Sequence, residues 1–88
     1  MVTVNKIDQN TYSVSVAEGG STTQHRVSVR SEYAKKLIVE SESIEDLIRR
    51  SFEFLLERES KESILSSFDL KVISRYFPEY ERVIKSKR

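Results

Sequence analysis

The feature that most constrains this sequence is a change in the spacing of its apolar residues near Ser31. Before Ser31 the apolar residues alternate with polar ones, which is typical of strands with one buried face. After Ser31 they recur at intervals of three and four, which is typical of amphipathic helices. We therefore expect one domain over 1–88, with a β part at 1–30 and a helical part at 31–88.

Three strands are predicted within the β part, at 2–7, 11–17 and 24–30. Residues 8–10, Asp-Gln-Asn, supply turn chemistry between the first two strands. Gly19-Gly20 offers the positive φ angles that a tight hairpin loop needs between the second and the third. The β part is therefore predicted to be a three-stranded antiparallel β-meander with a buried valine face and a polar face in water.

The clearest helix start lies at Ser43, which forms an approximate capping box with Asp46 three residues later. From Ile44 the apolar residues follow the 3.6-residue period over an arc of about 200°. A helix on the surface needs an arc about half as wide, so residues 44–58 are predicted to form an enclosed central helix. This prediction requires that three of its apolar residues be buried: Phe52, Phe54 and Leu55.

Shorter helices are predicted around the central one. Ser31 is a candidate N-cap for a first helix, which ends before the acidic connection that begins at Glu40. Asp69 is expected to open a later helix, and Pro78 suits the first turn of the last. The predicted fold class is thus α+β, a three-stranded meander followed by about four short helices packed around helix 44–58.

The composition excludes several kinds of chemistry. The chain has no Cys, which rules out disulfides, thiolate catalysis and cysteine zinc sites, and its one His cannot supply a histidine pair. We expect no metal, no cofactor and no catalytic residue, and therefore no enzyme. The longest apolar run has three residues, whereas roughly 20 are needed to cross a bilayer. We therefore expect a cytoplasmic protein without membrane contact.

Three polar groupings are candidate sites, and each has a simpler explanation. His25 suits an ordinary strand position, and Glu57, Glu59 and Glu62 suit a solvated helix end. The basic residues near the C-terminus match the helix dipole and favour solubility, although they could also meet phosphates. These basic residues are Lys71, Arg75, Arg82, Lys85, Lys87 and Arg88.

The segment 25–31, together with a short helix and then residues 43–52, resembles a ribbon-helix-helix DNA-binding module. In that family two chains pair their strands across a two-fold axis and place alternate strand side chains in the major groove. The resemblance implies base contacts from Arg26, Ser28 and Arg30, and a phosphate held by backbone amides near Ser43. Strand 11–17 can instead occupy the pairing edge within its own chain.

The C-terminal half, with segments 51–59, 63–70 and 75–80, is similar to a group of short bacterial proteins without an assigned function. The likeness implies a bacterial protein and carries no activity. By elimination, we expect a small protein-interaction domain with an unidentified protein partner, which binds at the edge of strand 2–7 or against the aromatic C-terminal helices. The alternative is a ribbon-helix-helix-like DNA-binding regulator or antitoxin.

Overall fold

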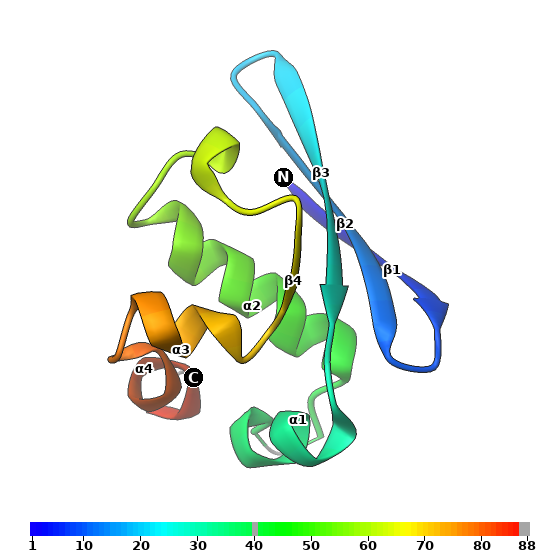
Figure 1. The fold of residues 1–88 in the computed structure, drawn as a ribbon, viewed down its shortest axis with the longest axis vertical. Helices are drawn as coiled ribbons and strands as arrows, with labels where there is room; N and C mark the ends of the chain where they lie inside the picture. Colours follow the sequence, from blue (N-terminus) through cyan, green and yellow to red (C-terminus); the bar gives the residue numbers. More distant parts are fainter. Residues whose placement is uncertain (40, 87–88) are drawn as a thin grey trace.

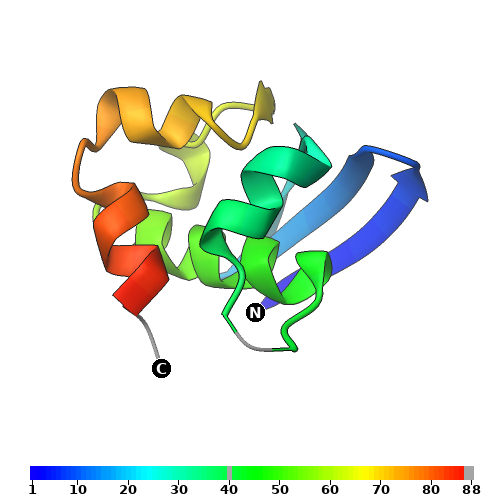
Figure 2. The same cartoon turned by 90° about the horizontal axis from the view of Figure 1, so that it is seen from below.

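A computed structural model of the chain describes residues 1–39 and 41–86. Its elements in chain order are β1 (Val2–Asp8), β2 (Thr11–Glu18), β3 (Ser21–Ser28), α1 (Ser31–Leu37), α2 (Ile44–Leu56), the 3-10 turn η1 (Lys61–Ser63), β4 (Ser67–Asp69), α3 (Val72–Tyr76) and α4 (Tyr80–Ser86). The strands form one sheet, and the helices of the described residues lie on one side of it (Figures 1 and 2). The α+β class is therefore confirmed.

The predicted meander is also confirmed, since β1, β2 and β3 pair antiparallel in chain order. Gly19 and Gly20 have φ angles of +61° and +83°, and Glu18 pairs with Ser21 across them. Two consecutive positive φ angles give a hairpin turn whose twist matches that of the strands. The inward valines of β2 and β3 are fully buried, as the two-residue period predicts: Val14, Val16 and Val27.

The prediction of a purely antiparallel sheet is wrong, because β4 adds a fourth strand parallel to β3. Asp69 was expected to open a helix, but it ends this strand, and α3 begins only at Val72. The Asp69 carboxylate accepts a hydrogen bond from the Ser28 hydroxyl at 2.9 Å and another from the Lys71 N–H at 3.0 Å. These bonds fix the turn between β4 and α3.

The predicted junction between the third strand and the first helix is displaced. β3 ends at Ser28, and Arg30 rather than Ser31 is the N-cap residue of α1, without a side-chain cap. Beyond the end of the strand the Val29 N–H still donates to the carbonyl of Asn10 at 2.9 Å, which continues the β2–β3 register by one residue. Val29 itself is buried, so the chain turns toward the core at this point.

The burial predicted for three apolar residues of the central helix is confirmed, since they are 0–4 % exposed: Phe52, Phe54 and Leu55. The predicted capping box is present, with the Asp46 N–H donating to the Ser43 hydroxyl at 3.1 Å. The helix ends at Leu56, two residues earlier than predicted. The Arg58 guanidinium turns back over the Phe54 ring at 3.6 Å, and the chain leaves the helix there.

The prediction that all the other helices pack around α2 is wrong in part. The sheet, α1 and α4 pack against α2, whereas α3 packs mainly against β4 and α4. Phe77 lies at the end of α3, and the edge of its ring meets Phe54 of α2 at a centroid distance of 5.9 Å. The space that remains between α3 and the C-terminal end of α2 is the site described next.

Candidate functional site

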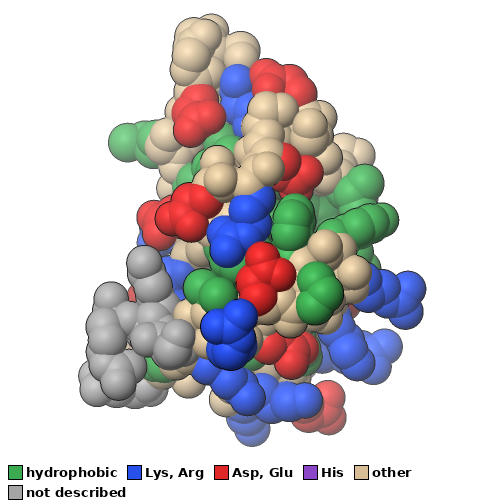
Figure 3. Space-filling view, turned by 90° about the vertical axis from the view of Figure 1, so that its left-hand side faces the viewer, with side chains coloured by type: hydrophobic (Ala, Val, Ile, Leu, Met, Phe, Trp, Pro, Cys, Tyr) green, Lys and Arg blue, Asp and Glu red, His purple; other side chains and the backbone are tan. Residues whose placement is uncertain are grey.

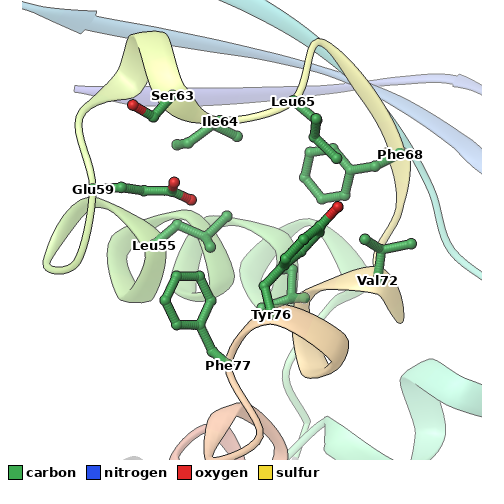
Figure 4. Close-up of a pocket in the computed structure, with 10 residues that line it drawn as sticks. Leu55, Glu59, Ser63, Ile64, Leu65, Phe68, Val72, Tyr76 and Phe77 are labelled. Carbon is green, nitrogen blue, oxygen red and sulfur yellow. The ribbon is translucent and has the colours of Figure 1, made fainter.

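A pocket of about 370 Å³ opens between the C-terminal end of α2, η1, β4 and α3 (Figure 4). Its walls are mostly apolar, and the side chains that form them include Leu55, Ile64, Leu65, Phe68, Val72 and Phe77. The floor comes from α2 through Leu55, which is almost fully buried. We call this hollow the apolar pocket.

Two large apolar side chains at this pocket are exposed to water. Leu65 is 47 % exposed and Tyr76 is 66 % exposed, and both belong to its lining. Among the described residues only Met1 and Ile7 are comparable, and they lie on or next to β1. Exposed apolar groups gathered around a concave surface are typical of binding sites.

The position of Leu65 depends on His25. The His25 Nδ1 lies 2.8 Å from the Leu65 carbonyl oxygen, and its Nε2 lies 2.9 Å from the Thr23 hydroxyl. A carbonyl only accepts, so Nδ1 carries the proton and, in the neutral ring, Nε2 accepts from Thr23. The ring is 4 % exposed and packs on Phe52 at 5.4 Å between centroids. His25 therefore anchors the segment that carries Leu65.

Tyr76 is positioned by the shortness of α3. This helix has five residues and ends before Pro78, which disfavours helical geometry at Phe77. Phe77 turns toward Leu55, whereas the Tyr76 side chain lies across the pocket with its hydroxyl toward Phe68 and Leu65 (Figure 4). The Phe-Pro step therefore separates a residue of the core from a residue of the rim.

Glu59 lies on the far side of the apolar pocket from Val72 (Figure 4). Its two sequence neighbours among the predicted carboxylates have ion-pair partners, since Glu57 pairs with Arg58 and Glu62 with Lys61. The hydrogen bond from Lys61 lowers the pKa of Glu62. Within the described residues Glu59 has no ion pair, so one end of the pocket carries an uncompensated negative charge.

A second hollow, of about 610 Å³, lies between the start of α1, the turn after β4 and α3. Four cationic side chains line it: Arg30, Lys36, Lys71 and Arg75. Its two carboxylates are Glu32 and Asp69, and Asp69 is already bonded to Ser28 and Lys71. In the described part of the chain none of the four cations forms a salt bridge. We call this hollow the basic cavity.

The four residues implied as nucleic-acid contacts differ in their surroundings. Arg26 is exposed on the sheet, Ser28 donates to Asp69, and Ser43 caps α2. Only Arg30 joins other basic residues, because it shares the basic cavity with Lys71 and Arg75. Of the remaining predicted basic residues, Lys87 and Arg88 lie outside the described residues, as does Glu40 of the acidic connection.

Both edges of β3 are occupied within its own chain. Arg26, Val27 and Ser28 pair with β2 on one side and with β4 on the other. In a ribbon-helix-helix dimer the corresponding strand needs a free edge for the second chain. The intramolecular pairing that the sequence left open is the one observed.

The free edge of the sheet is β1, but little of it can accept another strand. The backbone N–H and C=O groups of Met1 both bond to Ala17 of the neighbouring chain segment. Because such bonds alternate along an antiparallel strand, the backbone groups of Val2, Val4 and Lys6 point away from β2, toward the free edge. The Val2 carbonyl already accepts from the Arg49 guanidinium at 3.5 Å. The register then shifts between Lys6 and Asp8. Such a short, interrupted edge is typical of a strand protected from pairing.

The comparisons with known proteins give no neighbour: no family model, curated protein or solved structure matches this chain. Within residues 1–39 and 41–86, no helix has the length and hydrophobicity to cross a membrane. The same residues contain no group of three or more His, Asp or Glu side chains arranged to hold a metal ion. The candidate site therefore has to be interpreted from its own geometry.

Proposed function

We propose that this protein is a small non-enzymatic interaction domain, and that it binds a segment of a partner protein in the apolar pocket. The observation that carries the proposal is the exposure of Leu65 and Tyr76 on the rim of a preformed apolar hollow. A partner that covers both side chains would remove their apolar surface from water. Full burial of an exposed side chain of this size is worth about 1.5–3 kcal/mol, so covering the exposed 47 % of Leu65 and 66 % of Tyr76 would contribute roughly half to two-thirds of that range each. Tyr is also enriched among binding hot spots.

The shape of the pocket suits an apolar side chain of a peptide. A hollow of about 370 Å³ is large enough for one bulky anchor and part of a neighbouring residue. Its floor and walls belong to the hydrophobic core or pack against it, through Leu55, Phe68 and Phe77. A pocket held by core residues needs little rearrangement on binding, which reduces the entropic cost of association.

Two other candidate surfaces have less support. The edge of β1 offers few outward groups between the Arg49 contact and the register shift, so strand addition there would be short. DNA binding in the manner of a ribbon-helix-helix module would require β3 to exchange its intramolecular partners for a second chain. We therefore place the partner at the apolar pocket.

The experiment is a selection of short random peptides displayed on phage against the folded protein. We expect enriched peptides that share a bulky apolar anchor, and their addition should shift the amide resonances of Leu65, Val72 and Tyr76. Leu65→Ser and Tyr76→Ser should each weaken binding of a selected peptide at least tenfold, the effect of losing about 1.4 kcal/mol.

The matched control is Ile7→Ser. Ile7 is as exposed as Leu65, at 47 %, but it lies at the bulged end of β1. This variant removes a similar apolar group from a different surface, so it should bind the selected peptide as the parent does. Failure to enrich any peptide, or equal losses in Ile7→Ser and Leu65→Ser, would contradict the proposal.

A further inference from the structure

We infer that the basic cavity is the second half of the same binding surface, and that it binds an acidic group next to the apolar anchor of the partner segment. The inference rests on the proposed function, because it assumes that a peptide occupies the apolar pocket. It adds the chemical class of the partner, an acidic peptide, and the direction in which the peptide lies.

The two hollows share a wall. Val72, the first residue of α3, lines both of them. Its neighbour Lys71 lines the basic cavity, and further along the same helix Arg75 faces the basic cavity while Tyr76 faces the apolar pocket. Figure 3 shows hydrophobic side chains on one flank of the molecule with Lys and Arg side chains beneath them. An extended peptide can therefore meet both surfaces.

The charge of the basic cavity is available to a ligand. Its four cations outnumber its two carboxylates, Glu32 and Asp69, so the cavity keeps a positive balance. Lys36 lies 5.9 Å from the centroid of the Tyr33 ring, a weak cation–π contact. Arg30 and Arg75 have no salt bridge among the described residues, and a guanidinium can bind a carboxylate through two parallel hydrogen bonds.

The end of the apolar pocket that lies away from the basic cavity carries a negative charge. Glu59 borders it on the side away from Val72 (Figure 4). A peptide with acidic residues on both sides of its anchor would be repelled there, whereas a peptide that is acidic on one side would be attracted. The surface thus favours a single orientation, with the acidic side beyond Val72 and a neutral or basic side near Glu59.

An acidic peptide fits this surface better than a nucleic acid does. The chain carries 15 basic and 14 acidic residues, without the strong basic excess typical of nucleic-acid-binding domains. Four cationic residues gather in one cavity, and that cavity adjoins an apolar pocket that a phosphate backbone cannot fill. A peptide with an acidic side chain beside an apolar anchor can bind the basic cavity and the apolar pocket at the same time.

The test repeats the peptide selection on the charge-reversed variant Lys71→Glu/Arg75→Glu. From the parent protein we expect peptides with Asp or Glu on one side of the anchor. From the variant we expect the same anchor with Lys or Arg in those places. The control, Lys6→Glu/Lys35→Glu, makes the same change of charge at exposed positions outside both hollows, and it should select the parent's peptides.

A milder variant measures the effect on affinity. Lys71→Gln/Arg75→Gln should bind a peptide selected by the parent about 3- to 10-fold more weakly, the size expected for two partly exposed ion pairs. Added salt should weaken binding by the parent more than binding by this variant, because salt screens exposed charges.

The outcomes separate the inference from the proposed function. Apolar anchors without an acidic bias, or an acidic bias that survives charge reversal, would overturn the inference and leave the proposed function standing. An absence of enriched peptides would overturn both. A short DNA duplex that shifts the amide resonances of Arg30, Lys71 and Arg75, where the acidic peptide shifts none, would replace the inference with nucleic-acid binding.

Discussion

The two sides of α2 are covered in different ways. On one side the sheet covers the helix, and the fully buried ring of Phe52 packs on the buried His25 of β3. On the other side η1, α3 and the segment between them cover it only in part, so Leu55 becomes the floor of a pocket. One side is closed by regular pairing, and the other is left open by short elements.

The difference follows from the lengths of the elements. β2 and β3 have eight residues each and stay in register, so every second side chain contributes to a continuous layer. η1 has three residues and α3 has five. Each of these short pieces buries a single side chain, and Leu65, which lies between them, remains 47 % exposed. Apolar surface left open in a rigid frame is what a partner can use.

The open side is nevertheless held firmly by polar contacts beside it. The Ser51 hydroxyl donates to the Leu47 carbonyl at 2.8 Å, so the Tyr80 hydroxyl, 2.6 Å away, donates to Ser51. Arg50 binds both Glu42 and the carbonyl of Ile84. These bonds tie α4 and the segment before α2 to the helix, and α4 in turn packs against α3.

A substitution on the side of α2 that the sheet covers should have the largest effect on stability. Phe52→Ala removes a fully buried ring between β3 and β4 and should lower the free energy of unfolding by about 3–5 kcal/mol. For a domain of this size that corresponds to about 4–8 °C in melting temperature for each kcal/mol. Thermal and urea denaturation followed by circular dichroism measure it.

Phe52→Leu is the control for that variant, because it keeps most of the apolar volume. It should cost less than half as much as Phe52→Ala. Equal losses would mean that ring contacts rather than volume stabilise this side. A loss below about 1 kcal/mol in Phe52→Ala, far under the usual range, would contradict the sealed interior itself.

The hydrogen bond between Tyr80 and Ser51 should make the stability of the protein depend on pH in the alkaline range. Burial raises the pKa of Tyr80 above its usual value of 10.0. Above pH 10 the unfolded chain releases this proton while the native state keeps it, so the free energy of unfolding falls as pH rises. The stabilisation is complete below pH 10, and its loss has a slope of up to about 1.4 kcal/mol per pH unit for one tyrosine.

Tyr80→Phe tests this assignment. At neutral pH it should cost about 1 kcal/mol, since it removes a buried hydrogen bond to Ser51. Above pH 10 it should make the pH dependence of urea unfolding less steep by the contribution of one proton. Tyr33, whose pKa burial also raises, supplies the comparison through Tyr33→Phe. An unchanged slope in both variants would show that these tyrosines ionise freely in the native state.

Much of the fold could be predicted because the relevant signals are local. The hairpin follows from Gly19-Gly20, and α2 follows from the Ser43–Asp46 capping box and a wide apolar arc. β4 could not be predicted, because three residues are too few to show alternation and its partner β3 lies 41 positions earlier in the pairing of Arg26 with Ser67. Such a pairing depends on tertiary contacts.

The candidate site was predictable only in part. The sequence predicts Lys71 and Arg75 as part of a basic group and Arg30 as a base contact implied by resemblance, but their meeting in one cavity depends on the turn after β4. Leu65 carried a weak signal, as an apolar residue directly after the inward Ile64. Tyr76 and Phe77 are adjacent aromatic residues in the sequence, and only the break before Pro78 separates the exposed Tyr76 from the partly buried Phe77. Because the pocket is formed by several short elements, no periodic pattern in the sequence marks its lining residues.

The open side should give the smallest effect on stability. Leu65→Ser and Tyr76→Ser change side chains that are already 47 % and 66 % exposed, so each should alter the free energy of unfolding by no more than about 0.5 kcal/mol, as Ile7→Ser should. Urea denaturation of the three variants measures this, alongside their binding of the selected peptide. A loss above about 2 kcal/mol in Leu65→Ser or Tyr76→Ser would mean that the residue supports the core. If stability is kept while peptide binding is lost, these side chains serve the partner rather than the fold.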